Sequence, residues 1–211
     1  MKSIADIRKD YKQSRLLEND ISPNPIVQFT SWWKEAIESD IDEVNALTLA
    51  TANAQGKPSA RTVLLKGYDE NGFVFFTNYE SHKGKELAAN PYAAMVLFWK
   101  ELERQIRIEG FVEKISAGES DEYFYSRPAG SRIGAWASPQ STVINDRNIL
   151  EENVKNYSQN FGENIPRPVH WGGYRVVPSL IEFWQGRSNR LHDRIQYRKE
   201  NNNWIIERLA P

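Results

Sequence analysis

The 211-residue sequence contains no cysteine, only three histidines and no long apolar run. The absence of cysteine excludes disulfide bonds, thiolate metal centres, iron–sulfur clusters and a cysteine nucleophile. Because His82, His170 and His192 are the only histidines, a multi-histidine zinc site is not expected, and we predict no metal site. No apolar run approaches the ~20 residues that span a bilayer, and the charged residues 1–20 lack the apolar stretch of a signal peptide. We therefore expect a cytoplasmic protein without membrane contact.

An excess of charge of either sign is also missing. Lys and Arg number 27 and Asp and Glu number 28, so the net charge is −1. Proteins that bind nucleic acid concentrate basic residues, so we expect no nucleic acid partner. Apolar residues make up 40% of the chain, which is enough to form a core. Since no repeat or linker stands out, we predict a polar arm over residues 1–24 and a single domain over residues 25–211.

The hydrophobic pattern predicts one helix and then a series of short strands. Pro25 suits the first position of a helix in which Ile26, Phe29, Trp33 and Ile37 share one face. From about residue 44 the pattern alternates. It predicts strands at 45–51, 59–66, 73–77, 92–99, 104–114, 179–184 and 203–209. The strand at 92–99 is apolar at both parities and is predicted to be buried on both faces at the centre of the sheet.

Further helices are predicted between these strands. One runs from a Ser81 cap to about Asn90, one covers 119–126, and one begins after Asp146 and ends before Gly162. Short strands joined by tight turns favour a mainly β fold with flanking helices (α+β), built as an antiparallel barrel.

The segment RTVLLK places two basic residues, Arg61 and Lys66, on one predicted strand. Their separation puts them on opposite faces of a regular strand. They can serve one ligand only if a bulge, a strand end or a subunit boundary intervenes. The alternative is that both are solvated residues at a strand edge.

The segment FTNYESHKGKE places Lys83 and Lys85 in the first turn of a predicted helix. The helix dipole disfavours cations there, whereas a phosphate would satisfy both the lysines and the free N–H groups. The alternative is that the lysines point into water at a cost of a few tenths of a kcal/mol.

The segment YFYSRPAGSRIGAWASPQS combines hydroxyls with arginine. Tyr123, Arg127 and Ser131 are spaced four residues apart, and Arg132, Gln140 and Ser141 follow. Charged donors and directional O–H groups together suit a phosphate dianion. The alternative is a helix end with a surface arginine and structural tyrosines.

The segment IEFWQGRSNRLHDR opens the densest basic cluster of the chain, which comprises Arg187, Arg190, Arg194, Arg198 and Lys199 against Asp193. Arg190 and His192 are predicted to share a strand face near Trp184. Lone histidines are usually structural, but this combination favours a site.

Taken together, RTVLLK, FTN with a lysine-bearing helix start, LERQIRIEG, SRPxxSxIGAWxSxQS, WGGYRV, IEFWQGxxxRLHDR and ERLAP closely resemble the pyridoxamine 5′-phosphate oxidase family. The resemblance covers nearly the whole chain. It implies a homodimeric split β-barrel that binds FMN at the subunit interface. It also implies oxidation of pyridoxamine or pyridoxine 5′-phosphate to pyridoxal 5′-phosphate, by hydride transfer from C4′ to flavin N5, with O₂ as acceptor and H₂O₂ as product.

The resemblance also implies the site residues. The FMN contacts would be Arg61, Thr62, Val63, Leu64, Leu65, Lys66, Phe76, Thr77, His82, Lys83, Gln105, Gln140, Ser141, Trp184 and Arg194. The substrate contacts would be Arg8, Lys9, Asp10, Tyr11, Lys66, Tyr123, Arg127, Ser131, Arg190, Leu191 and His192, with Arg190 and His192 catalytic and residues 8–11 closing over the pocket. His82 stands where the family often has arginine, and Phe76 where tyrosine is common.

The chemistry of the two ligands agrees with these assignments. FMN and the substrate each carry a phosphate of about −1.5 to −2 at pH 7, so several cations must converge. Two other functions remain open. A split-barrel flavoprotein can be a nicotinamide-dependent reductase, and a small barrel rich in aromatic and basic residues can bind single-stranded nucleic acid.

Overall fold

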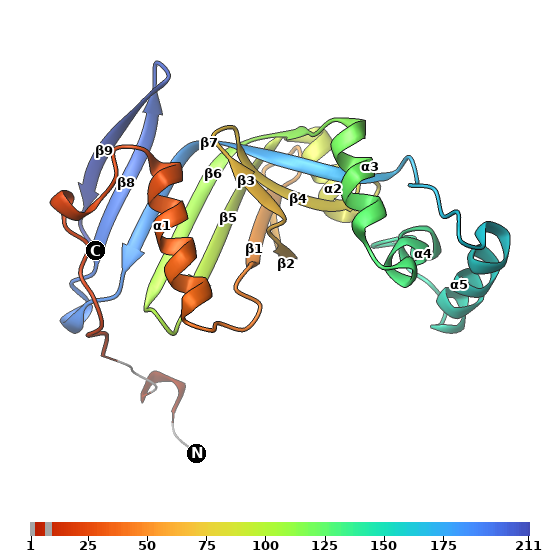
Figure 1. Ribbon diagram of the computed structural model, residues 1–211. Coiled ribbons are helices and arrows are strands. Elements are labelled where there is room, and N and C mark those ends of the chain that lie inside the picture. Colours follow the sequence, from red (N-terminus) through yellow and green to blue (C-terminus); the bar gives the residue numbers. More distant parts are fainter. Residues whose placement is uncertain (1–2, 7–9) are drawn as a thin grey trace.

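The computed structural model describes residues 3–6 and 10–211, and its centre is an antiparallel β-sheet that curls into a split half-barrel (Figure 1). The strands run in the order β2-β1-β5-β6-β7-β4-β3, and β8 and β9 extend the sheet from β7. The strands are β1 (Ala46–Ala52), β2 (Pro58–Leu64), β3 (Gly67–Asp69), β4 (Gly72–Asn78), β5 (Tyr92–Trp99), β6 (Arg104–Lys114), β7 (Trp171–Gln185), β8 (Asp193–Glu200) and β9 (Asn203–Leu209). This confirms the predicted fold class.

Among the described residues, five α-helices flank the sheet. They are α1 (Pro25–Glu38), α2 (His82–Ala89), α3 (Ala117–Ser126), α4 (Ala129–Ala137) and α5 (Asn148–Phe161). Helices α3, α4 and α5 gather beyond the start of β7, whereas β8 and β9 lie at the other end of that strand (Figure 1). No helix among the described residues is long and apolar enough to cross a membrane.

Helix α1 begins as its sequence predicts. Pro25 is the first helical residue, and the Asn24 side chain accepts hydrogen bonds from the amides of Ile26 and Val27. The predicted buried face is wrong in one residue, because Ile37 is 54% exposed. The buried face is turned toward Trp32, whose ring packs edge-on against Phe183 of β7.

The long strand β7 organises the molecule. It pairs with β6 along almost its whole length, while its other edge is shared between β4 at the start and β8 at the end. A bulge between Glu109 and Gly110 lies opposite Pro178. A Cβ on Gly110 would lie 2.0 Å from the carbonyl oxygen of Val177, so only glycine fits there.

The predictions about these elements are wrong in several places. The last strands were expected at 179–184 and 203–209, but β7 already begins at Trp171, and β3, β8 and helix α4 were missed. Glycines within β7 and α4, together with Pro178 in β7, lower the local propensity and hid both elements. Arg190 and His192 do not share a strand face. Arg190 ends a 3₁₀ turn (Ser188–Arg190) with a φ of 61°, and His192 precedes β8.

Strand β5 is central, as predicted, but it is not buried on both faces. Its outward side chains Tyr92 and Phe98 are 62% and 52% exposed, and Phe111 of β6 lies opposite Tyr92. Leu64 of β2 is also exposed. The sheet therefore presents an apolar outer face to its surroundings.

Candidate functional site

A polar cleft of about 310 Å³ opens where β2, β4, the start of α2 and the α3–α4 junction meet. Three cationic side chains line it. Its lining residues are Thr62, Val63, Leu64, Lys66, Phe76, Thr77, Lys83, Tyr123, Arg127, Gln140 and Trp171. Arg61 lies on β2, but Lys66 follows the end of that strand. A bulge, a strand end or a subunit boundary could let both residues serve one ligand, and the structure shows a strand end between them.

Lys83 enters the cleft from the first turn of α2. Its Nζ donates to Gln140 Oε1 (3.0 Å) and to Thr77 Oγ1 (3.1 Å). Burial lowers the pKa of Lys83, and the nearby charge of Arg61 lowers it further. All of its partners here are neutral, so the ammonium keeps a net charge with which to attract an anion.

Arg127 brings a buried donor to the cleft. Its Nη2 donates to the Ser131 carbonyl (2.8 Å), and its guanidinium lies 4.6 Å from the Trp171 ring centre. Its Nη1 is buried and has no hydrogen-bond partner. Burial lowers the pKa of Arg127. A buried donor without a partner costs free energy, so this nitrogen fits an anionic acceptor placed in the cleft.

Arg61 and His82 lie beside the cleft and share a partner, Glu86, that sequence reasoning missed. Arg61 pairs with Glu86 Oε2 (3.3 Å), and His82 Nε2 lies 3.0 Å from Oε1. Glu86 is 6% exposed. Burial alone would raise its pKa, but hydrogen bonds from Ser59 and Thr51, the charge of His82 and a hydrogen bond from Arg61 lower it. The carboxylate therefore offsets part of the positive charge predicted for this side of the site.

A second cluster forms around the 186–192 loop at the far end of β7. The rings of Trp184 and His192 lie 4.6 Å apart, and Tyr11 packs edge-on against both. The amide of Arg187 donates to His192 Nδ1 (3.1 Å), which leaves the proton of the neutral ring on Nε2. Burial and the charge of Arg190 lower the pKa of His192, so this ring is neutral at pH 7.

Ion pairs brace the sheet beside this cluster. Arg194 Nε donates to Glu182 Oε1 (2.8 Å), and Arg107 Nε donates to Oε2 of the same carboxylate (3.2 Å). Gln105 lies opposite Trp184 in the β6–β7 pairing. Arg194, Gln105 and Trp184 were all predicted as site residues.

The two clusters lie at opposite ends of one strand. Trp171 borders the cleft and Trp184 borders the loop, and both belong to β7. At about 3.3 Å per residue, the two tryptophans are on the order of 40 Å apart along the strand. One protomer therefore does not bring its own cleft and its own 186–192 loop together.

The other predicted site residues are placed as follows. Ser131 contributes its carbonyl to Arg127, and Leu191 and Ser141 are exposed. Leu65 is buried in the core, and both its amide and its carbonyl bond to Asn45. Asp10 pairs with Lys12. Arg8 and Lys9 lie outside the described residues.

Solved structures of known proteins share this architecture. A crystal structure of an FMN-binding protein related to pyridoxamine 5′-phosphate oxidase, from Nostoc punctiforme, aligns with a TM-score of 0.72 over 90% of this chain and all of that chain. At 18% identity it shows the fold alone. PhzG from Burkholderia lata, solved with tetrahydrophenazine-1-carboxylic acid, aligns with a TM-score of 0.88 at 32% identity over 93% of this chain and 98% of its own. The fold and the cationic cleft thus define a split-barrel flavoprotein.

Sequence comparison narrows this class. Residues 33–161 match the family described as pyridoxamine 5′-phosphate oxidase, and residues 171–211 match the pyridoxine 5′-phosphate oxidase C-terminal dimerisation region. Curated pyridoxine/pyridoxamine 5′-phosphate oxidases from Cyanothece and Ralstonia nicotianae are each 58% identical and cover 99% and 100% of this chain and of their own. The chain belongs to the pyridoxine/pyridoxamine 5′-phosphate oxidase family and is an oxidoreductase with FMN as its cofactor.

Proposed function

We propose that the protein oxidises pyridoxamine 5′-phosphate and pyridoxine 5′-phosphate to pyridoxal 5′-phosphate. When bound, FMN would supply the hydride acceptor for C4′ and the electron pair that reduces O₂ to H₂O₂. The amine substrate additionally consumes water and releases ammonia. The single observation that carries this proposal is the cleft in which Lys66, Lys83 and the unpartnered Nη1 of Arg127 converge, because it suits phosphorylated ligands.

The cleft residues divide between the two phosphates. We assign Lys83 and Arg61, with His82, to the FMN phosphate, since they surround the start of α2. Residues 62–66, Phe76, Thr77, Gln140 and Ser141 complete this part of the cofactor site. Lys66, Tyr123, Arg127 and Ser131 are assigned to the substrate phosphate. In support, Lys66 Nζ lies 6.0 Å from the Tyr123 ring, and Arg127 bonds the Ser131 carbonyl.

The 186–192 loop supplies the groups for the substrate ring. Arg190 and His192 orient the ring, and Leu191 and residues 8–11 cover it. His192 presents an Nε2–H donor because its Nδ1 already accepts from the Arg187 amide. The cation of Arg190 stabilises electron density on the pyridine oxygen and assists loss of the proton as the hydride leaves.

A second copy of the chain completes each site. Because the cleft and the loop lie at opposite ends of β7, the loop that serves one cleft comes from the partner subunit. The exposed Tyr92, Phe98, Phe111 and Leu64 give the sheet an apolar outer face on which that partner can pack. Gln105, Trp184 and Arg194 would then meet the flavin bound in the partner's cleft. The protein is thus an obligate homodimer with FMN at the subunit interface.

An anaerobic absorbance titration tests the reaction. We expect the purified protein to be yellow, and addition of pyridoxamine 5′-phosphate to bleach the flavin with formation of one pyridoxal 5′-phosphate per flavin. Readmission of O₂ should restore the colour and produce H₂O₂. Bleaching by NADPH but not by pyridoxamine 5′-phosphate would instead establish a nicotinamide-dependent reductase, and a colourless protein would contradict the flavin site.

A further inference from the structure

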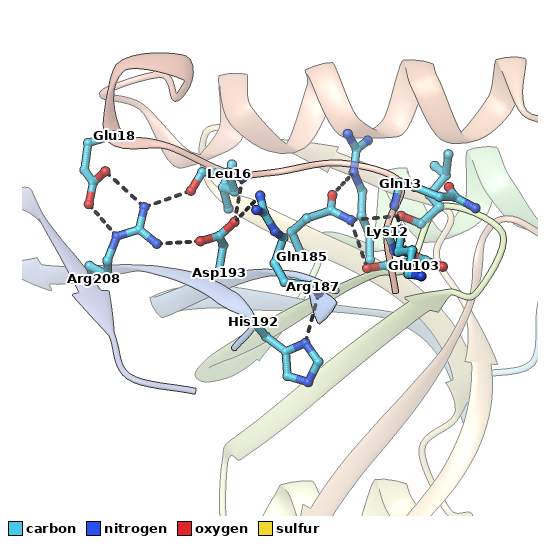
Figure 2. Close-up of polar contacts among 12 residues, drawn as sticks. Lys12, Gln13, Leu16, Glu18, Glu103, Gln185, Arg187, His192, Asp193 and Arg208 are labelled. Atoms are coloured by element: carbon cyan, nitrogen blue, oxygen red, sulfur yellow. Dashed lines mark hydrogen bonds and ion pairs between the residues drawn. The ribbon is translucent and has the colours of Figure 1, made fainter. Parts of the chain in front are cut away.

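The segment Tyr11–Glu18, termed here the strap, runs across the end of the sheet next to the 186–192 loop (Figure 2). It contains no α-helix or strand, so its backbone needs hydrogen-bond partners from elsewhere. Two carboxylates supply them. Neither was assigned a role by sequence reasoning, although both lie in motifs of the resemblance.

Glu103 holds the first half of the strap. Its Oε2 accepts from the amides of Lys12 (2.8 Å) and Gln13 (3.1 Å). The same residue is bound to the end of β7, because its carbonyl accepts from the amide of Gly186 (2.7 Å) and from Gln185 Nε2 (3.2 Å). Glu103 is 2% exposed. A buried carboxylate is costly unless it accepts hydrogen bonds. The amides of Lys12 and Gln13 therefore stabilise the buried Glu103 carboxylate, and the carboxylate in turn stabilises the docked strap.

Asp193 holds the second half of the strap. Its Oδ2 accepts from the amide of Leu16 (3.1 Å), and its Oδ1 accepts from Arg208 Nη1 (3.0 Å). Arg208 also donates to the Leu16 carbonyl (2.8 Å) and pairs with Glu18, as Figure 2 shows. That pairing lowers the pKa of Glu18 to about 2. Asp193 directly follows His192, and Glu103 bonds Gly186 at the start of the 186–192 loop. The two carboxylates therefore bind the strap at the two ends of this loop.

The docked strap places Tyr11 against the predicted catalytic histidine. The Tyr11 ring lies 5.9 Å from that of His192 and 5.7 Å from that of Trp184. It also covers Gly186 so closely that a Cβ there would lie 2.7 Å from Tyr11 Cγ. His192 is thereby held between its hydrogen bond from Arg187 and the packing of Tyr11.

We propose that Glu103 and Asp193 are positioning residues that hold the strap and, through Tyr11, fix the orientation of His192 for substrate binding. The inference rests on the proposed function for the role of His192. Neither carboxylate is assigned a contact with the reacting atoms, and their effect on the reaction passes through the strap.

Hydrogen exchange of the FMN-loaded dimer tests, without any substrate, whether Glu103 and Asp193 hold the strap. In Glu103→Gln, the amides of Lys12 and Gln13 should exchange about tenfold faster or more, since a charge-assisted acceptor is lost. Asp193→Asn should have the same effect at Leu16. Glu101→Gln, on the same turn as Glu103, and Glu200→Gln, at the other end of β8, are the matched controls. Unchanged exchange at these strap amides would overturn the proposal.

Kinetics and a double-mutant cycle test whether Glu103 affects substrate binding through Tyr11. Glu103→Gln should raise KM for pyridoxamine 5′-phosphate about tenfold while the FMN dissociation constant stays at the wild-type value. In a Tyr11→Ala background the same substitution should add no further increase, because the contact it supports is already gone. Independent, multiplying effects would overturn the proposal. Gly186→Ala, which displaces the Tyr11 ring, should reproduce the KM increase if a carboxylate variant fails to fold.

The two levels of inference fail separately. If the wild-type protein does not turn over pyridoxamine 5′-phosphate, the proposed function is wrong. The exchange experiment then still decides whether Glu103 and Asp193 hold the strap.

Discussion

Lys83 is the single side chain on which FMN affinity should depend most directly. Its ammonium is half-buried, it bonds only neutral groups among the partners seen here, and burial lowers its pKa. We expect Lys83→Ala to weaken FMN binding tenfold to a hundredfold, because a charge-assisted hydrogen bond contributes roughly 1.5–3 kcal/mol. Flavin fluorescence titration of the apoprotein measures this. Lys85→Ala, exposed on the same helical turn, is the control. An unchanged dissociation constant would show that Lys83 is a solvated helix residue.

Arg190 is the side chain on which turnover should depend most. It is exposed in one protomer, and both it and Asn189 adopt positive φ, at 61° and 56°. Two consecutive non-glycine residues in this region are unfavourable, and such strain clusters at functional sites. We expect Arg190→Ala to remain a yellow, folded dimer while kcat/KM for pyridoxamine 5′-phosphate falls by orders of magnitude, more than in Arg8→Ala.

The Arg190 substitution has a conservative counterpart. Arg190→Lys keeps the charge but loses the planar guanidinium, so it should restore only part of the activity. Near-wild-type turnover by Arg190→Ala would leave this residue as part of a basic surface and nothing more.

At the scale of elements, Glu182 joins three strands. It lies on β7 and pairs with Arg107 of β6 and Arg194 of β8. Burial alone would raise its pKa, but the hydrogen bonds from both arginines hold the pKa below its ordinary value. Glu182→Gln removes the buried carboxylate that Arg194 and Arg107 share and leaves Arg107 only its pair with Glu109, so we expect it to lower the free energy of unfolding by about 3 kcal/mol.

Urea unfolding measures this change, and Glu207→Gln, at an exposed pair with Arg198, should have a much smaller effect. The sign of the pH dependence follows from the lowered pKa of Glu182. Its contribution is complete above the ordinary pKa of 4.5 and is lost as the pH falls through the lower folded-state value. The difference between wild type and Glu182→Gln should therefore shrink below about pH 4.5. A difference that is constant down to pH 3 would contradict the role of the charged carboxylate.

At the scale of the whole molecule, each site should combine residues from two subunits. A heterodimer of an Arg127→Ala subunit and an Arg190→Ala subunit would place both substitutions in one site and leave the other site intact. We expect such a heterodimer, purified with two different tags, to recover about half of the wild-type activity, although each homodimer is nearly inactive. If the heterodimer stays inactive, cleft and loop come from the same subunit. A stable FMN-loaded monomer in sedimentation would reject the dimer altogether.

The amino-acid sequence alone determined most of the elements and the family. Strands 92–99 and 104–114 were predicted with their observed bounds, because alternation and turn signals are local properties. The helix start at Pro25 and the Ser81 cap are local in the same way. The resemblance to the oxidase family likewise rested on short motifs that the chain carries in order.

Only the tertiary structure decided which of these residues meet. Trp171 and Trp184 belong to one long strand that separates the cleft from the loop. The sequence did not predict the first half of this strand, because Gly172, Gly173 and Pro178 have low strand propensity. Glu86 bonds Arg61, Glu103 bonds Lys12 and Asp193 bonds Leu16 across 25, 91 and 177 residues, and no local pattern encodes such pairings. Burial on both faces of β5 was predicted from its apolar pattern, yet its outer face is exposed in the single chain. In the proposed dimer the partner subunit would cover it. Periodicity reports which residues prefer to avoid water, whereas the folded arrangement determines what they contact.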